Sequence, residues 1–180
     1  MMSLQAIRKL AAAGALVAAM MALPTGIKAQ AVAETTGDKA LKPADTEKLL
    51  PATVFYRGQS APTQPRNSGG VKFADGYYVL AALVDTSGYS TELQAKYQAW
   101  FVAEVPIKIG GQSLPAGIYG VGFVADKFVV TDVGAHDVLT VNSAVDAAFR
   151  RPMPLQVIPD PTGSGGFRLY AGRNYVSFSR

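Results

Sequence analysis

His136 is the residue best suited to acid–base chemistry, because it is the only histidine of the 180-residue chain and imidazole titrates near neutral pH. It lies in the segment TDVGAHD, with Asp132 and Asp137 close to it. A histidine oriented by a carboxylate, with a serine such as Ser143 or Ser177 as nucleophile, is the arrangement of a hydrolase. The chain has no G-x-S-x-G nucleophile motif, and Asp and Gly are typical of turns. We therefore interpret the segment as a turn between strands, with the hydrolase as the alternative.

Metal chemistry is restricted to oxygen ligands, since the chain has no cysteine and a single histidine. Asp126, Asp132 and Asp137 are the aspartates that could gather around Ca²⁺, which prefers oxygen ligands, but the D-x-D-x-D-G pattern is absent. A glycosidase needs two carboxyl groups a short distance apart, for which Asp85 and Glu104 lie on expected strands. Solvated carboxylates explain these residues more simply. No phosphate-binding glycine loop is present, so we expect neither a metal nor another cofactor.

Aromatic side chains offer a route to binding rather than catalysis. The chain has eight tyrosines and one tryptophan, and such side chains stack on sugars or hold apolar ligands when they lie on an exposed sheet face. The candidate contacts are Trp100, Tyr89 and Tyr119, together with Arg66 and Asn67 in a polar loop. Trp100 is expected to be the most exposed of these aromatic residues, because it lies on the mixed face of its strand.

The N-terminus has the pattern of a secretory signal peptide. Arg8 and Lys9 precede an apolar run of 14 residues, 10–23, and small residues around Ala31 fit a cleavage site. The run is shorter than the roughly 20 residues that a membrane-spanning helix needs, and no later segment is apolar enough to span. We therefore predict a signal peptide over 1–31 and a periplasmic or secreted protein. Its removal leaves 14 basic and 13 acidic residues, a balance that gives no basis for binding nucleic acid.

The remaining chain is predicted to form a flexible leader over 32–50, with a helical turn over 43–50, and one domain over 51–180. Short runs of Val, Ile, Phe and Tyr between Gly, Pro, Asn and Asp predict strands, at 53–57, 71–73, 77–85, 100–109, 117–125, 128–133, 138–141, 155–158, 167–170 and 175–178. Two short helices are expected, over 91–98 and 143–150, and an irregular loop over 58–70. The fold class is all-β, a single β-sandwich or partly closed barrel with one or two short helices.

Turn residues give the clearest local signal. In the segment 109–124, IGGQSLPAGIYGVGFV, Gly110 and Gly111 favour a tight hairpin, and Leu-Pro-Ala-Gly and Tyr119 lead into the next strand. The segment resembles a hairpin of secreted bacterial β-proteins of unknown function. That resemblance implies an exported β-domain and supplies no activity. We expect a non-enzymatic domain of the bacterial envelope that binds a small apolar ligand, a glycan or an envelope protein, with a hydrolase using His136 and a nearby Asp and Ser as the alternative.

Overall fold

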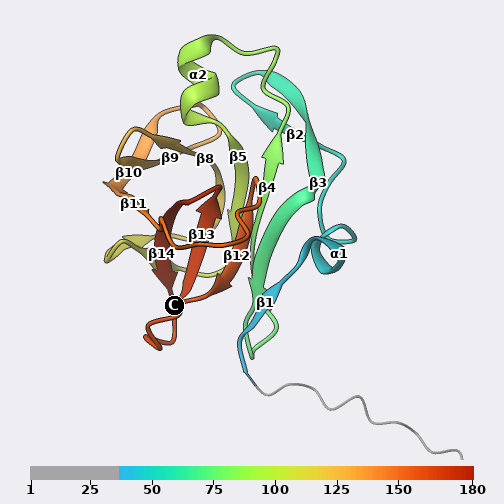
Figure 1. Cartoon of the computed structure of the whole chain (residues 1–180). Coiled ribbons are helices and arrows are strands. Elements are labelled where there is room, and N and C mark those ends of the chain that lie inside the picture. The colour runs from blue at the N-terminus through green and yellow to red at the C-terminus, as the bar shows by residue number, and fades with distance from the viewer. Residues whose placement is uncertain (1–36) are drawn as a thin grey trace, which may run out of the picture. The chain divides into compact units, whose positions relative to one another are not determined.

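The computed structural model describes residues 37–180, and the predicted signal peptide and the first part of the predicted leader lie outside the described residues. Two antiparallel sheets pack together as a sandwich and do not close into a barrel, which confirms the all-β prediction (Figure 1). The described residues belong to one compact unit. Among them, no helix has the length and apolar character needed to cross a membrane.

The larger sheet contains most of the first two thirds of the described chain. Its strands, in spatial order, are β1 (Lys39–Leu41), β3 (Gln59–Lys72), β4 (Tyr78–Val84), β5 (Ala99–Ala103), β8 (Gly117–Val124), β9 (Lys127–Thr131) and β10 (Asp137–Asn142), and β2 (Thr53–Tyr56) also pairs with β3. The smaller sheet has the order β12 (Gln156–Pro159), β13 (Phe167–Ala171), β14 (Asn174–Ser179), β6 (Ile107–Ile109) and β7 (Gln112–Leu114), and β11 (Ala144–Val145) pairs with β14. Two short helices, α1 (Pro43–Thr46) and α2 (Thr91–Lys96), complete the fold.

The main core lies between the sheets and follows the predicted alternation. Every second residue of 100–109, beginning with Phe101 and ending with Ile109, is buried in it. The run is not one strand, however, because the chain bends over 104–106 and passes from β5 in the larger sheet to β6 in the smaller one. The predicted hairpin of Gly110 and Gly111 joins β6 to β7 with φ angles of +55° and +84°, values that glycine adopts without steric cost.

A second core covers the outer face of the larger sheet. Tyr56 from β2 and Tyr97 from the end of α2 stack with ring centroids 3.7 Å apart, and Tyr89 packs edge-on against both. Trp100 belongs to the same cluster. Gly120 of β8 leaves the space for these rings, since a Cβ on Gly120 would lie 2.6 Å from Tyr56 and 2.7 Å from Tyr97. The outer face of the larger sheet is therefore packed rather than open at this end.

Three local predictions were wrong, and in the second and third of them the partner strand is remote in sequence. Residues 58–70 are not an irregular loop but form much of β3, which pairs with β2 and β4. The predicted helix over 143–150 is instead the short strand β11, paired with β14, followed by turns. Within the predicted flexible leader, residues 39–41 pair with β3, and α1 packs beside them. The helix predicted over 91–98 is confirmed as α2, capped by the Ser90 hydroxyl.

Candidate functional site

The predicted histidine–aspartate pair forms in the turn between β9 and β10. His136 Nδ1 lies 3.0 Å from Asp132 Oδ2, and 79% of the histidine side chain is exposed. Asp132 Oδ1 accepts hydrogen bonds from the backbone N–H groups of His136 and Gly134. The bonds from the His136 backbone and then its side chain are the main causes that lower the pKa of Asp132. The carboxylate thus shapes the turn as well as orienting the imidazole.

The other residues proposed for a hydrolase do not join this pair. Asp137 binds Lys96 Nζ at 3.0 Å. Ser143 follows the far end of β10, about 20 Å along the strand at its usual rise per residue, and Ser177 lies on β14 in the other sheet. Within residues 37–180, His136 makes no side-chain hydrogen bond to a serine, so no nucleophile is positioned beside it.

The predicted carboxylate sites are also dispersed. Among the described residues no group of three potential metal ligands occurs; Asp126 lies beside Lys127 at 3.5 Å, whereas Asp132 and Asp137 have the contacts given above. Glu104 accepts a hydrogen bond from the backbone of Tyr78, at the start of β4. Asp85 follows the other end of β4, about 20 Å away, which is too far for a glycosidase pair.

The aromatic ligand contacts proposed from the sequence are buried. Trp100, Tyr89 and Tyr119 are only 9%, 7% and 8% exposed, so the expectation of an exposed Trp100 was wrong. Trp100 and Tyr89 lie in the second core beneath β2 and α2, and Tyr119 lies in the main core. Each aromatic face is already in contact with protein, so none can stack on a sugar in this conformation.

Arg66 and Asn67 lie in a bulge of β3 rather than in a loop. The pairing of β3 with β4 shifts between Gln64 and Ser68, which leaves the intervening residues without partners on β4. Asn67 Nδ2 donates to Gln64 Oε1 at 2.9 Å, and Arg66 is exposed. Because it lies in the bulge, Arg66 has no partner residue on β4. Trp100, Tyr89 and Tyr119 are not paired with the bulge, so Arg66 and the proposed aromatic contacts do not form one site.

A hollow on the outer face of the smaller sheet was not anticipated from the sequence. It has a volume of about 320 Å³, is open on one side and is formed by β6, β14 and the loop between β12 and β13, with the lining residues Lys108, Gly110, Gly111, Asp160, Ser164, Gly166, Ser177, Phe178 and Ser179. Strand alternation explains this lining. Phe178 packs into the main core, so its neighbours Ser177 and Ser179 project to the outer face. We call this hollow the groove.

An ion pair buried beside the groove fixes one of its walls. Arg168 Nη2 lies 3.0 Å from Asp160 Oδ1, and the two side chains are only 11% and 8% exposed. The guanidinium carbon of Arg168 lies 4.3 Å from the ring centroid of Tyr175, a cation–π arrangement. The pair is placed there by register, since Arg168 on β13 lies opposite Ser177 of β14.

Asp160 is held ionised at neutral pH despite its burial. Burial alone raises the pKa of Asp160, but hydrogen bonds from Thr162 and the charge of Arg168 outweigh burial and lower it. The Thr162 backbone and hydroxyl and the Arg168 guanidinium all contact Oδ1. A hydrogen bond from the Ser164 hydroxyl also lowers the pKa of Asp160, and none of the three contacts at Oδ1 uses Oδ2.

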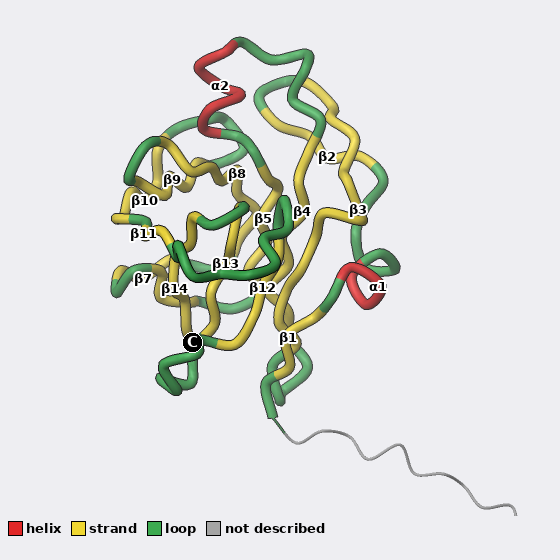
Figure 2. The backbone as a smooth tube through the Cα atoms, viewed as in Figure 1, coloured by secondary structure: helices red, strands yellow, loops and turns green. Residues whose placement is uncertain are grey.

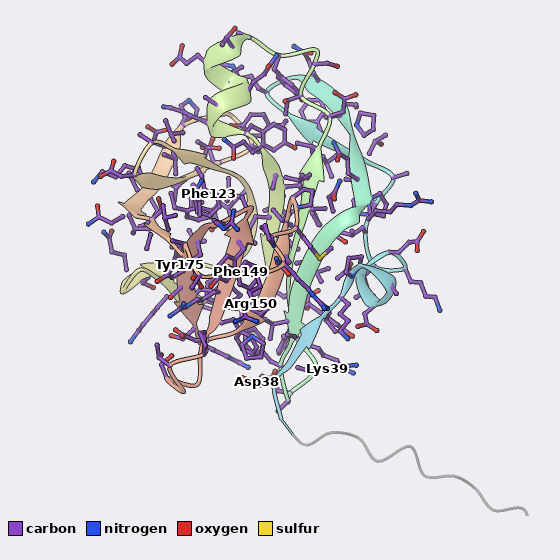
Figure 3. The ribbon with its side chains drawn as sticks, in the orientation of Figure 1. Asp38, Lys39, Phe123, Phe149, Arg150 and Tyr175 are labelled. Atoms are coloured by element: carbon purple, nitrogen blue, oxygen red, sulfur yellow. The ribbon has the colours of Figure 1, made fainter. Side chains whose placement is uncertain are left out.

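Aromatic rings support the arginine from the side away from the groove. Tyr170 stacks on Tyr175 and on Phe149, with centroids 5.2 Å and 4.5 Å apart. Its hydroxyl donates to Asp146 Oδ2 at 3.1 Å and accepts from Arg168 Nη1 at 3.4 Å. Phe149, Arg150 and Tyr175 lie over the smaller sheet in Figure 3, and the segment after β11 crosses this face in Figure 2. Arg168 is therefore held at a fixed position between a carboxylate and a stack of rings.

Comparisons with family models, with curated proteins and with solved structures give no match.

Proposed function

We propose that this chain is an exported, non-enzymatic binding domain of the bacterial envelope that holds a small polar ligand in the groove. The observation that carries the proposal is the largely buried Arg168–Asp160 pair, of which Asp160 lines the groove. Removing two charges from water costs several kcal/mol per ion, so such a pair adds little net stability. Fixed charges at the edge of a hollow are, by contrast, what a site needs to orient a polar ligand.

The size and lining of the groove support a ligand of about one sugar ring. A volume of about 320 Å³ is at the low end of the roughly 300–1,000 Å³ typical of ligand pockets. Serine hydroxyls, a lysine and a carboxylate line it, whereas Phe178 is buried and Tyr175 is covered by Arg168. Most of the lining surface is nevertheless carbon, as suits the apolar face of a sugar ring, and a wholly apolar ligand would leave the polar groups unsatisfied. Of the ligands expected from the sequence, a glycan or another small polar molecule is thus favoured.

Export is supported by the sequence pattern of the first 31 residues. Sequencing the N-terminus of the protein recovered from the periplasm or culture medium of a bacterial host would test it. The expected mature N-terminus lies within about two residues of Ala31. An intact N-terminus in the cytoplasm would contradict export.

An NMR titration with a panel of monosaccharides and small hydroxy acids tests the binding proposal. The backbone amides of Gly110, Gly111 and Gly166 line the groove and appear in a separate spectral region, so they report binding there directly. Ser179→Phe fills the groove and should abolish the shifts, whereas Ser60→Phe, at an exposed serine of β3, should preserve them. If no ligand moves these glycine signals, or if Ser179→Phe binds as the unaltered protein does, the proposal is wrong.

The second candidate is a hydrolase, favoured by the 3.0 Å contact between His136 and Asp132. Its weakness is the lack of a neighbouring nucleophile among the described residues. Ester and glycoside substrates assayed with the unaltered protein and with His136→Ala would decide between the two functions. A rate above the buffer blank that disappears in His136→Ala would favour the hydrolase over a binding domain.

A further inference from the structure

Lys108 and Asp160 present opposite charges to the groove, but only one of them is neutralised by the protein. Asp160 is paired with Arg168. Lys108 is exposed on β6, and within residues 37–180 it forms no ion pair or side-chain hydrogen bond. The register places it opposite Ser179 of β14, whose side chain also lines the groove. The groove therefore has one free cation, one partly satisfied carboxylate acceptor and several hydroxyls.

A neutral sugar matches only part of this set. Its hydroxyls can donate to Asp160 Oδ2 and exchange hydrogen bonds with Ser177 and Ser179. The ammonium of Lys108 would then remain without an anionic partner. Because a hydrogen bond between ionised groups is roughly twice as strong as a neutral one, a ligand with one negative group close to Lys108 should bind more tightly.

A phosphate group matches the charged and hydroxyl groups of the groove less well than a single carboxylate does. Its two negative charges would lie in the same small hollow as the carboxylate of Asp160, whose pKa is lowered from an already acidic value and which is therefore ionised at neutral pH. Phosphate is often bound in bidentate fashion by arginine. The two terminal nitrogens of the Arg168 guanidinium already contact Asp160 and Tyr170, and its face lies over the ring of Tyr175.

From these contacts, and resting on the proposed binding function of the groove, we infer that its ligand is a hydroxylated monocarboxylate of the uronic acid class. Lys108 binds the ligand carboxylate, and Asp160 accepts a hydrogen bond from a ligand hydroxyl. Ser177 and Ser179, on the strand between these two residues in the sheet, bind the remaining hydroxyls. The ligand is either a free sugar acid or a unit of an acidic polysaccharide, since the groove is open on one side.

NMR titrations of the purified protein with glucose, glucuronate, glucose 6-phosphate and a galacturonate trisaccharide test this inference. Glucuronate should bind about two- to fivefold more tightly than glucose, since an exposed ion pair contributes up to about 1 kcal/mol. Lys108→Gln should remove that preference. Lys72→Gln, at an exposed lysine of β3 in the other sheet, should keep it. The preference should also weaken with added salt, because the Lys108 side chain is exposed.

Each outcome has a separate meaning. Equal binding of glucose and glucuronate, or an unchanged preference in Lys108→Gln, overturns the uronic acid inference but leaves the binding function intact. Tighter binding of glucose 6-phosphate than of glucuronate overturns it in favour of a phosphate ligand. Failure of every probe to shift the groove glycines overturns both proposals. If glucuronate is preferred, tighter binding of the trisaccharide identifies an acidic polysaccharide, and equal or weaker binding identifies a free sugar acid.

Discussion

Tyr97→Phe is the substitution whose effect the packing predicts most sharply, because it removes a buried hydroxyl that has no hydrogen-bond partner. The Tyr97 side chain is 0% exposed, and its hydroxyl has no hydrogen bond among the described residues. The ring stacks on Tyr56 with an interplanar angle of 13°. Phenylalanine keeps this ring packing and deletes only the unsatisfied group.

The expected gain follows from the cost of leaving a buried polar group unpaired, about 1–3 kcal/mol. Tyr97→Phe should therefore raise the free energy of unfolding by at least about 1 kcal/mol. For a domain of this size such a change raises Tm by about 2–4 °C.

Tyr56→Phe is the matched control, since Tyr56 is the other ring of the stack. Its hydroxyl lies 2.7 Å from Thr131 Oγ1, and the Thr131 hydroxyl donates to the carbonyl of Gly120. Tyr56 is therefore the donor to Thr131, and losing this bond should lower the free energy of unfolding by about 1 kcal/mol. The same chemical change in two stacked rings is thus predicted to have opposite signs.

The burial of Tyr97 also predicts how the free energy of unfolding changes at alkaline pH. Burial is the largest cause that raises the pKa of Tyr97 above its ordinary value of 10.0. As pH rises, the unfolded chain loses the tyrosine proton first, so the unfolded state is favoured. The stability linked to this proton is complete below pH 10 and is lost progressively above it. Tyr97→Phe should therefore show a shallower fall in stability between neutral pH and pH 11 than the unaltered protein.

Urea denaturation followed by Trp100 fluorescence measures both effects, because Trp100 is the only tryptophan and lies in the same cluster. Tyr97→Phe and Tyr56→Phe should shift the midpoint in opposite directions with an unchanged slope. A loss of about 1 kcal/mol or more in Tyr97→Phe would mean that the hydroxyl has a partner, such as an internal water. That result would contradict an unpaired Tyr97 hydroxyl.

Three further predictions, on packing and on ion pairs, are tested by urea or thermal denaturation. Gly120→Ala should cost about 1–3 kcal/mol by overpacking, since its Cβ would lie under 3 Å from three side-chain atoms; unaltered stability would contradict the close approach. Asp160→Asn should lower the free energy of unfolding by about 3 kcal/mol, because it leaves the charge of Arg168 buried and uncompensated. This loss should clearly exceed that of Asp137→Asn, although both ion pairs measure 3.0 Å. Equal losses in the two variants would show that burial does not make the Asp160 pair different from the exposed Asp137 pair. Asp132→Ala should lower Tm by removing the acceptor of two backbone N–H groups, whereas His136→Ala should not; a comparable loss in His136→Ala would assign the turn to the imidazole.

Local alternation predicted strands with a regular apolar pattern. It failed for 58–70, whose partners β2 and β4 are its neighbours in the chain, and for 39–41 and 143–150, whose partners are remote. Phe101 and its alternate neighbours face the core as expected, because the side-chain period of a strand is a local property. Residues 58–70 contain Pro62 and Pro65, which suggested a loop. Pro65 is accommodated because it lies in the bulge, where no ladder hydrogen bond is required.

The misplacement of Trp100 has a different cause. Its strand was correctly assigned two faces, but the pattern does not state what covers the second one. That cover comes from β2 and α2, which contribute Tyr56 and Tyr97 from other parts of the chain. An aromatic residue opposite a core face is exposed only if no other element packs there, and this depends on tertiary structure.

The groove escaped sequence analysis because its charged residues are far apart in the chain and meet only through register. Three strands of the larger sheet, β8, β9 and β10, lie between Lys108 and Asp160 in the chain. A partial signal was nevertheless present, since the strand 167–170 places Arg168 and Tyr170 on the face opposite Phe167 and Leu169. An arginine beside a tyrosine on the outer face of a strand differs from the small or charged residues typical of a face that is simply exposed to solvent.

The strongest turn signal of the sequence lies at the groove, and this links the local hairpin to the proposed site. A Cβ on Gly110 would lie 2.9 Å from Val141 Cβ of β10, so glycine is needed there both for its φ angle and for close packing on the edge of the other sheet. The backbone N–H of Gly110 also donates to the carbonyl of Ser177. The turn is thereby fixed to β10 on one side and to β14 on the other, and Lys108 lies two residues before it. The hairpin therefore gives Lys108 a rigid base from which its flexible side chain can reach a ligand carboxylate.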